Sequence, residues 1–187
     1  KDVGLKLLAG ATVTQPGQCL VKRVLAEMGG KNAIIVDETA DLDEAIVDCT
    51  YSAFGYQGQK CSALSRLILL AENYDRVMER LLKAAASVRV GNPEEPGITV
   101  GPVIDEAAYS RILEYIQIGK SEATLAYQSE DVPAKGFFIS PTIFSDVKPN
   151  MRIAREEIFG PVISVLKVRD LDEAIAVANG TDYALTA

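Results

Sequence analysis

The sequence contains no histidine, no tryptophan and only three cysteines among its 187 residues. Without histidine, the chain alone cannot build a serine–histidine or cysteine–histidine catalytic pair. A zinc site would need an unusual set of ligands, and we predict no metal site. Any general base must therefore be a carboxylate, a lysine or a group from outside the chain.

The three cysteines, Cys19, Cys49 and Cys61, are odd in number and widely spaced. This pattern does not fit a disulfide framework, so we expect a reducing, cytoplasmic compartment. No secretory signal is visible, and no apolar run approaches the roughly 18 residues that cross a bilayer. The chain begins with Lys1 rather than methionine, so a targeting segment cannot be assessed.

The formal net charge is −7. An acidic surface repels phosphate backbones, so we expect no nucleic-acid partner, and we expect no membrane partner either. Hydrophobic residues make up 48% of the chain and charged residues 24%, a composition that supports an ordinary globular core.

Short apolar strands alternate with amphipathic helices along the chain, which predicts an α/β fold with three layers, a mainly parallel sheet having helices on both faces. The sequence DLDEAI occurs twice after a strand, at 41–46 and 170–175. In each copy the first aspartate can cap a helix, and the glutamate three residues later, Glu44 or Glu173, can complete a capping box. Strands are expected at 19–26, 32–36, 64–71, 123–127, 142–147 and 162–166, and helices at 1–9, 74–89 and 106–118.

The stretch YSAFGYQGQKCSALSR at 51–66 is the most informative. Glycines at 55 and 58 allow a backbone to approach a ligand closely, and the loop ends at Cys61 just before a strand. Lys60 beside Cys61 would favour the reactive thiolate, although it also fits a solvated charge. Residue type alone equally allows Cys61 to be a small buried apolar residue.

Three segments together resemble the aldehyde dehydrogenase superfamily. FGYQGQKCSALSR resembles the segment that bears its nucleophile, AEMGGKN resembles its Glu-Leu-Gly-Gly-Lys motif, and EEIFGPV resembles a motif that holds the cofactor ribose. They occur in family order, with 61 − 27 = 34 positions from Glu27 to Cys61 and 157 − 61 = 96 positions from Cys61 to Glu157. PTIF at 141–144 and VGPVID at 100–105 also fit, so the resemblance covers essentially the whole chain.

Within the superfamily, residues 30–66 and 136–144 are similar to the 1-pyrroline-5-carboxylate dehydrogenase branch, which also occurs in bifunctional proline-utilisation proteins. That branch oxidises L-glutamate γ-semialdehyde to L-glutamate in proline degradation. Ser62 after the cysteine is typical of it. The resemblance implies substrate contacts from Ser62 and Lys60.

The resemblance also assigns catalytic and cofactor roles. Cys61 would attack the aldehyde carbon, and after oxidation Glu27 would activate the water that hydrolyses the thioester. NAD or NADP would be the cofactor, with Glu157 on the nicotinamide ribose, Phe159 supporting the ring and Gly29 letting the chain pass close by. Without the motif, Glu157 would equally pair with Arg152 or Arg155, which belong to the same segment.

The resemblance implies a fragment of a longer enzyme. Residues 1–28 would be the end of a cofactor-binding domain, and 29–187 a catalytic domain incomplete at its C-terminus. Part of the oxyanion hole and most of the cofactor site would lie elsewhere, so the chain alone is expected to be inactive. Expected partners are a small aldehyde, the remainder of the enzyme chain and, at full length, further copies of the same protein.

Three alternatives stay open at this point. One is another aldehyde dehydrogenase branch that acts on a semialdehyde, and a second is a non-catalytic binding or structural module of the same fold. A cysteine hydrolase or acyltransferase would use the same thioester chemistry, but the absence of histidine argues against it.

Overall fold

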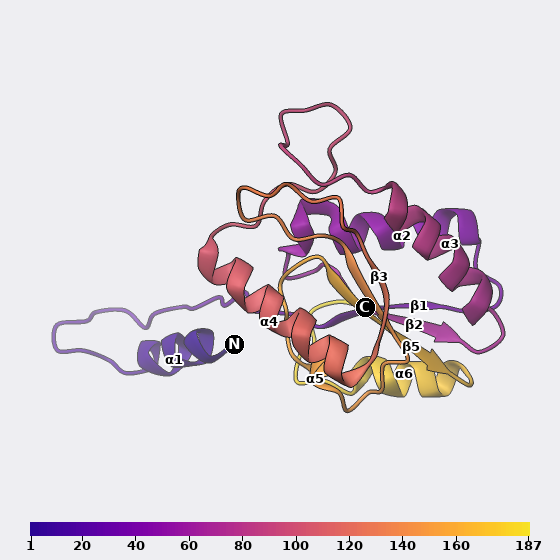
Figure 1. The fold of residues 1–187 in the computed structure, drawn as a ribbon. Coiled ribbons are helices and arrows are strands. Elements are labelled where there is room, and N and C mark those ends of the chain that lie inside the picture. Colours follow the sequence, from indigo (N-terminus) through magenta and orange to yellow (C-terminus); the bar gives the residue numbers. More distant parts are fainter.

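A five-stranded sheet forms the centre of the computed structural model, which describes all residues 1–187 (Figure 1). Its order is β1-β2-β5-β4-β3. Neighbouring strands are parallel except β3, which runs antiparallel to β4 at one edge. The strands are β1 (Asn32–Val36), β2 (Leu64–Leu70), β3 (Thr124–Gln128), β4 (Thr142–Ser145) and β5 (Val162–Val168).

Helices cover both faces of this sheet (Figure 1). Side chains of α2 (Leu42–Phe54) and α3 (Tyr74–Ser87) join one apolar core. The opposite core takes side chains from α4 (Glu106–Glu122), α5 (Arg152–Arg155) and α6 (Leu171–Asn179). Because strand side chains point alternately to opposite faces, β2 contributes to both cores. The predicted three-layer α/β fold with a mainly parallel sheet is therefore confirmed.

The two copies of DLDEAI both begin helices, but neither forms the predicted capping box. Asp170 accepts a hydrogen bond from the Glu173 N–H at 2.8 Å, while Glu173 accepts the Arg169 N–H rather than that of Asp170. Asp41 accepts from the Asp43 N–H instead, two residues on. The backbone at Asp41 is less extended than at Asp170, so its carboxylate reaches a nearer donor.

The predicted strand at 19–26 is wrong. These residues have no regular structure, and none of the five strands pairs with them. Leu20, Val21 and Leu25 are each more than 80% exposed. A strand needs the backbone of a neighbour, and this chain supplies none here.

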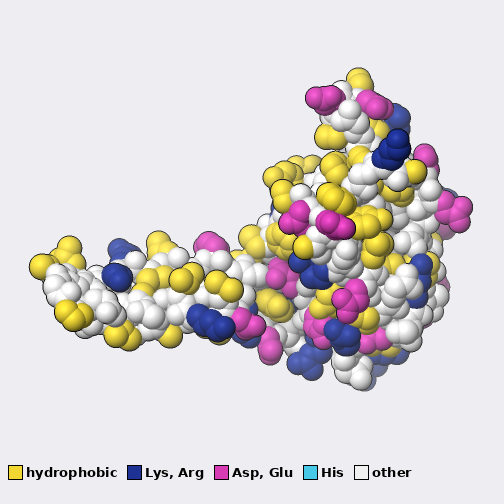
Figure 2. Space-filling model, turned by 60° about the vertical axis from the view of Figure 1, so that its left-hand side comes forward, with side chains coloured by type: hydrophobic (Ala, Val, Ile, Leu, Met, Phe, Trp, Pro, Cys, Tyr) yellow, Lys and Arg dark blue, Asp and Glu magenta, His cyan; other side chains and the backbone are white.

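Residues 1–28 instead form an arm that projects from the body (Figure 1). It contains α1 (Asp2–Ala11), as predicted for 1–9, and no residue of that helix is buried. Hydrophobic side chains lie exposed along its length (Figure 2). No helix in the molecule combines the length and the apolar content needed to cross a membrane.

Candidate active site

The segments that carry the three motifs meet at the amino-terminal ends of three strands of the sheet. β1, β2 and β5 are parallel neighbours. The motif residues come directly before each of these strands or at its start. The amino ends of neighbouring parallel strands lie side by side. The fold therefore brings together three segments that are distant in the sequence, 26–32, 54–66 and 156–162.

The turn before β2 presents Cys61 at the surface. After α2 the chain enters a short 3₁₀ segment, Gly55–Gly58, in which Tyr56 and Gln57 both have a φ of 56°. Non-glycine residues rarely adopt this left-handed conformation, which often accompanies functional sites. The Ala63 N–H then bonds to the Lys60 carbonyl at 3.0 Å. Cys61 lies within this turn and is exposed, so the alternative of a buried apolar thiol is wrong.

The side chain of Asn32, at the start of β1, is hydrogen-bonded to the turn that contains Cys61. Its amide nitrogen donates to the carbonyl of Cys61 at 2.7 Å and to that of Ala63 at 2.9 Å. Asn32 is 5% exposed. Asn32 was not among the residues predicted for the site, although a polar side chain at the start of a buried strand is a signal for such a role.

Glu157 reaches across to the segment before β1. Its Oε1 accepts the Gly30 N–H at 2.9 Å. A Cβ on Gly29 would overlap the Glu157 carboxylate, and one on Gly30 would overlap the Cys61 carbonyl. Glycine is therefore required at both positions by close approach. Neither arginine considered as a partner of Glu157 is paired with it.

Arg152 is paired with Glu156, the carboxylate next to Glu157 in the sequence. The Arg152 guanidinium donates to both oxygens of Glu156, at 3.0 and 2.9 Å. Tyr115 also donates to Glu156, at 2.8 Å. Arg152 is therefore the first cause of the lowered pKa of Glu156. This network leaves Glu157 available to the motif segments.

A cavity of about 550 Å³ opens where these segments meet. It gathers five residues singled out from the sequence, although Glu27 lies in an exposed loop. Arg111 of α4 adds a cation that was not predicted, because only the tertiary fold brings α4 to this cavity. The lining residues are Glu27, Met28, Gly29, Cys61, Arg111, Glu157 and Phe159.

The two residues expected to contact substrate, Lys60 and Ser62, do not line this cavity. The Lys60 ammonium lies over the ring of Tyr51, 5.3 Å from its centroid. The Tyr51 ring is thus a local partner for this charge.

The other two cysteines differ from each other. Cys19 is exposed in the arm, because no element covers that segment. Cys49 in α2 is 1% exposed. Its burial, with a smaller contribution from Asp48, raises the pKa of the thiol to about 12. Cys61 is thus the one cysteine that combines exposure with a position in the cavity.

Comparisons with known proteins show the family of the chain. The chain belongs to the aldehyde dehydrogenase family, whose pattern matches residues 6–187. It is 51% identical over 186 residues to a 1-pyrroline-5-carboxylate dehydrogenase of Geobacillus thermodenitrificans and 50% identical to one of Bacillus subtilis. Each match covers the whole chain but 36% of the relative, so the chain spans about a third of these enzymes.

Solved structures give the same result. A 1-pyrroline-5-carboxylate dehydrogenase from Thermus with bound NAD superposes with a TM-score of 0.92 at 50% identity, covering 98% of this chain and 36% of that one. Proline utilization A from Bdellovibrio bacteriovorus, inactivated by N-propargylglycine, gives 0.95 at 49% identity, covering 98% and 19%. The fold described above is therefore the fold of part of the aldehyde dehydrogenase architecture.

The exposed thiols Cys61 and Cys19 should both react with iodoacetamide at pH 8 much faster than the buried Cys49. A pKa near 12 leaves Cys49 with roughly 10³-fold less thiolate than an ordinary thiol, so its labelling should be slower by about that factor. Mass spectrometry of timed digests gives the three rates, and the urea-unfolded chain is the control in which they should converge. Labelling of Cys49 as fast as that of Cys61 and Cys19 in the folded chain would contradict its burial.

Replacing Gly29 by alanine should displace the Glu157 carboxylate. We expect Gly29→Ala to lower the free energy of unfolding by about 1–3 kcal/mol, as overpacking does. Gly10→Ala is the matched control, because nothing lies within 4 Å of a Cβ there and alanine favours the helix. Urea titration measures both. A loss for Gly10→Ala as large as that for Gly29→Ala would rule out the close-approach explanation.

Proposed function

We propose that this chain forms part of an NAD(P)-dependent aldehyde dehydrogenase that oxidises L-glutamate γ-semialdehyde to L-glutamate. The observation that supports it best is that Cys61, Glu27, Glu157 and Phe159 line one cavity. A thiol, a carboxylate base and a second carboxylate suited to a diol are the groups that thioester-forming oxidation requires.

In this proposal the Cys61 sulfur adds to the aldehyde carbon, and the carbonyl electron pair moves to the oxygen. The Cys61 N–H donates to that oxygen, and further donors come from outside the chain. Oxidation of the thiohemiacetal leaves a thioester on Cys61. Glu27 then accepts a proton from water as the water oxygen attacks the thioester carbon, which releases the carboxylic acid and frees the thiol.

The residues beside Cys61 fit a bound nicotinamide cofactor. Glu157 uses Oε1 for the Gly30 N–H, so Oε2 is left to accept hydrogen bonds from a ribose diol. Oε2 lies where a Cβ on residue 29 would be, so a larger residue than Gly29 would displace it. When bound, NAD or NADP supplies the hydride acceptor. Phe159 would support the nicotinamide ring.

The names of the relatives support the choice of substrate. Relatives at about 50% identity are 1-pyrroline-5-carboxylate dehydrogenases, and that of Thermus was solved with NAD. Ser62 and Lys60 remain our proposed substrate contacts. In the present structure they lie outside the cavity lining, so that role requires the turn or the cavity to be completed by other parts of the enzyme.

The exposed arm supports assignment of residues 1–28 to a cofactor-binding domain and 29–187 to the catalytic domain. Its apolar side chains are exposed along both α1 and the segment that follows. Contiguous exposed apolar surface of this kind marks an interface. We infer that the remainder of the enzyme chain covers it. The unpaired thiols favour a cytoplasmic location, and we expect the complete protein to form homo-oligomers.

The longer enzyme carrying Glu27→Gln should separate acylation from deacylation. Reaction at Cys61 does not need this base, so a burst of reduced cofactor should remain. Steady turnover should fall by roughly 10²- to 10⁴-fold. Stopped-flow absorbance on glutamate semialdehyde measures both phases, and Glu94→Gln in the exposed loop before α4 is the control. Loss of the burst together with turnover would assign Glu27 a different role.

The 187-residue chain alone should not turn over glutamate semialdehyde. Loss of one oxyanion donor typically costs about 10²–10³ in rate, and most of a dinucleotide site lies outside these residues. Calorimetric titration with NAD and a steady-state assay of the isolated chain test this. Sub-millimolar NAD binding with sustained cofactor reduction would show that the chain is sufficient.

A further inference from the structure

No step of the oxidation proposed above uses the side chain of Asn32, which is nevertheless bonded to the turn that carries the nucleophile. Its amide nitrogen donates to the Cys61 carbonyl at 2.7 Å and to the Ala63 carbonyl at 2.9 Å. Both partners are acceptors, so the amide must present its nitrogen and not its oxygen to them. Asn32 is 5% exposed, which shields these two bonds from water.

Asn32 lies where the pairing of β1 with β2 becomes irregular. The register shifts between Asn32 and Ala33, which leaves Ser65 as an extra residue on β2. The Ser65 hydroxyl donates to the Asn32 carbonyl at 3.2 Å. Such irregularities interrupt the ladder of backbone hydrogen bonds, as β-bulges do, and bulges often lie beside active sites. Before this point, the side chain of Asn32 supplies the bonds that tie the turn to β1.

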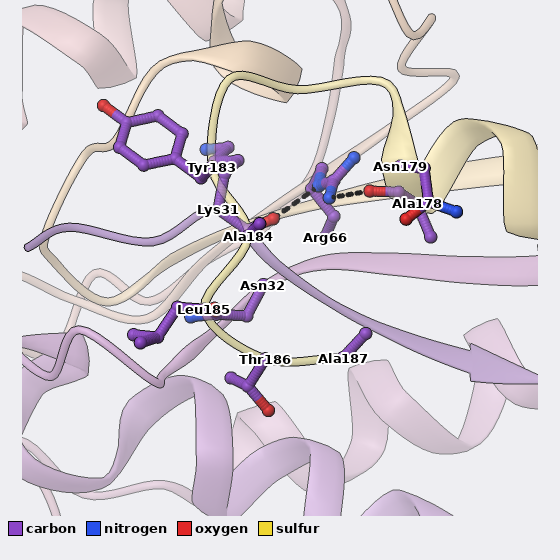
Figure 3. Close-up of a pocket in the computed structure, with 10 residues that line it drawn as sticks. All are labelled: Lys31, Asn32, Arg66, Ala178, Asn179, Tyr183, Ala184, Leu185, Thr186 and Ala187. Carbon is purple, nitrogen blue, oxygen red and sulfur yellow. Dashed lines mark hydrogen bonds between the residues drawn. The ribbon is translucent and has the colours of Figure 1, made fainter.

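The backbone that carries Asn32 is itself held in place. The Arg66 guanidinium donates to the Lys31 carbonyl at 2.8 Å. It also donates to the carbonyls of Val177 and Ala178 at the end of α6, at 2.8 and 2.7 Å. Figure 3 shows Lys31, Asn32 and Arg66 together, with bonds of Arg66 dashed. Asn32 therefore projects from a fixed support and not from a loop.

Two peptide planes flank the Cα of Cys61, and each is held by its own hydrogen bond. The plane before it contains the Lys60 carbonyl, which accepts the Ala63 N–H at 3.0 Å. The plane after it contains the Cys61 carbonyl, which accepts from Asn32. Peptide units are planar and here all trans, so the two planes together define φ and ψ at Cys61. These angles set the direction of its Cα–Cβ bond.

The same planes relate the thiol to the oxyanion donor. In the proposed oxidation the sulfur bonds to the aldehyde carbon while the Cys61 N–H, which lies in the first plane, donates to the aldehyde oxygen. Both groups must therefore point at one carbonyl group at the same moment. Releasing the second plane lets φ at Cys61 vary, and φ decides where the sulfur lies relative to that N–H.

We propose that Asn32 is a positioning residue for the nucleophile, because its amide fixes the Cys61 backbone so that the thiol and the N–H address the same aldehyde group. It touches no reacting atom and acts only through the backbone of the turn. Gly30 belongs to the same arrangement, since a Cβ there would overlap the Cys61 carbonyl that Asn32 holds. The inference rests on the proposed oxidation for its reaction step, but not for the bonds between Asn32 and the turn.

Asn73 is a matched control within the same chain. It is 3% exposed, and its amide donates to the carbonyls of Val36 at 3.2 Å and Asp37 at 2.5 Å. Both asparagines are thus buried, and each bonds two carbonyls. Asn73 does so at the opposite end of β1 from the Cys61 turn. Loss of either amide should lower stability, but only loss of Asn32 should affect the nucleophile.

The longer enzyme carrying Asn32→Ala or Asn73→Ala should be mixed with NAD and glutamate semialdehyde in a stopped-flow instrument. For Asn32→Ala the rate of the burst of reduced cofactor should fall by roughly 10- to 10²-fold, as it does when a reacting group is misplaced. Its burst amplitude and NAD dissociation constant should stay unchanged. For Asn73→Ala the burst rate should also stay unchanged, although urea titration should show a loss of stability for both variants.

Asn32→Asp separates hydrogen bonding from packing. Aspartate keeps the size of the side chain, but its carboxylate can only accept hydrogen bonds. It would face the carbonyls of Cys61 and Ala63 without a donor, so it should not restore the burst rate. A burst rate in Asn32→Asp equal to that of the unsubstituted enzyme would show that packing alone is sufficient.

A further measurement needs no variant to fold. In the unsubstituted longer enzyme with ¹⁵N-labelled asparagine side chains, alkylation of Cys61 by iodoacetamide should shift the NH₂ resonances of Asn32. The group added to the sulfur disturbs the turn whose carbonyls this amide holds. The NH₂ resonances of Asn73 should stay in place. No oxidation takes place in this measurement.

An unchanged burst rate in folded Asn32→Ala, or an equal loss in Asn73→Ala, would overturn the proposal. So would a loss of NAD affinity as large as the loss of rate, or unmoved Asn32 resonances after alkylation. If the unsubstituted longer enzyme does not oxidise glutamate semialdehyde, the proposed substrate is wrong, while the resonance shift still decides whether Asn32 is coupled to Cys61. The two conclusions therefore fail separately.

Discussion

The candidate active site depends on how closely the chain passes itself at Gly29 and Gly30. The Glu157 carboxylate lies where a Cβ on Gly29 would be, and the Cys61 carbonyl lies where a Cβ on Gly30 would be. The Gly30 N–H then bonds to Glu157 at 2.9 Å. Because this contact joins segments more than a hundred residues apart, it brings the segments of Glu27, Cys61 and Glu157 together in one place.

Most of the fold could be predicted from local sequence patterns. Buried strands such as 32–36 and 64–71 are short, rich in aliphatic residues and bounded by turns, so their position follows from sequence alone. The segment 19–26 has the same composition but no neighbour within this chain, and composition cannot report whether a partner strand exists. The lack of a covering element also explains why Cys19 is exposed. Cys49 is buried because α2 packs it into one of the two apolar cores.

The site was predictable where a motif spans it and unpredictable where tertiary packing supplies a residue. Cys61, Glu27 and Glu157 could be named because their spacing resembles that of a family. Arg111 and Asn32 could not, since one reaches the cavity from a separate helix and the other acts through its amide on a carbonyl. The capping boxes failed for a smaller reason, because the backbone angles of the cap residue decide which donor its carboxylate reaches.

The direction of the strands also determines the electric field at the thiol. α2, α3 and α6 each begin where a parallel strand ends, so their positive N-terminal poles, roughly half a unit charge each, lie at the edge opposite Cys61. Many α/β proteins bind anions at that carboxyl edge, where helix poles assist. Those three poles therefore do not assist a thiolate or an oxyanion at Cys61, whereas Arg111 of α4 brings a cation to its cavity. Negative charge at this edge must be stabilised by individual donors, which makes its chemistry sensitive to each one.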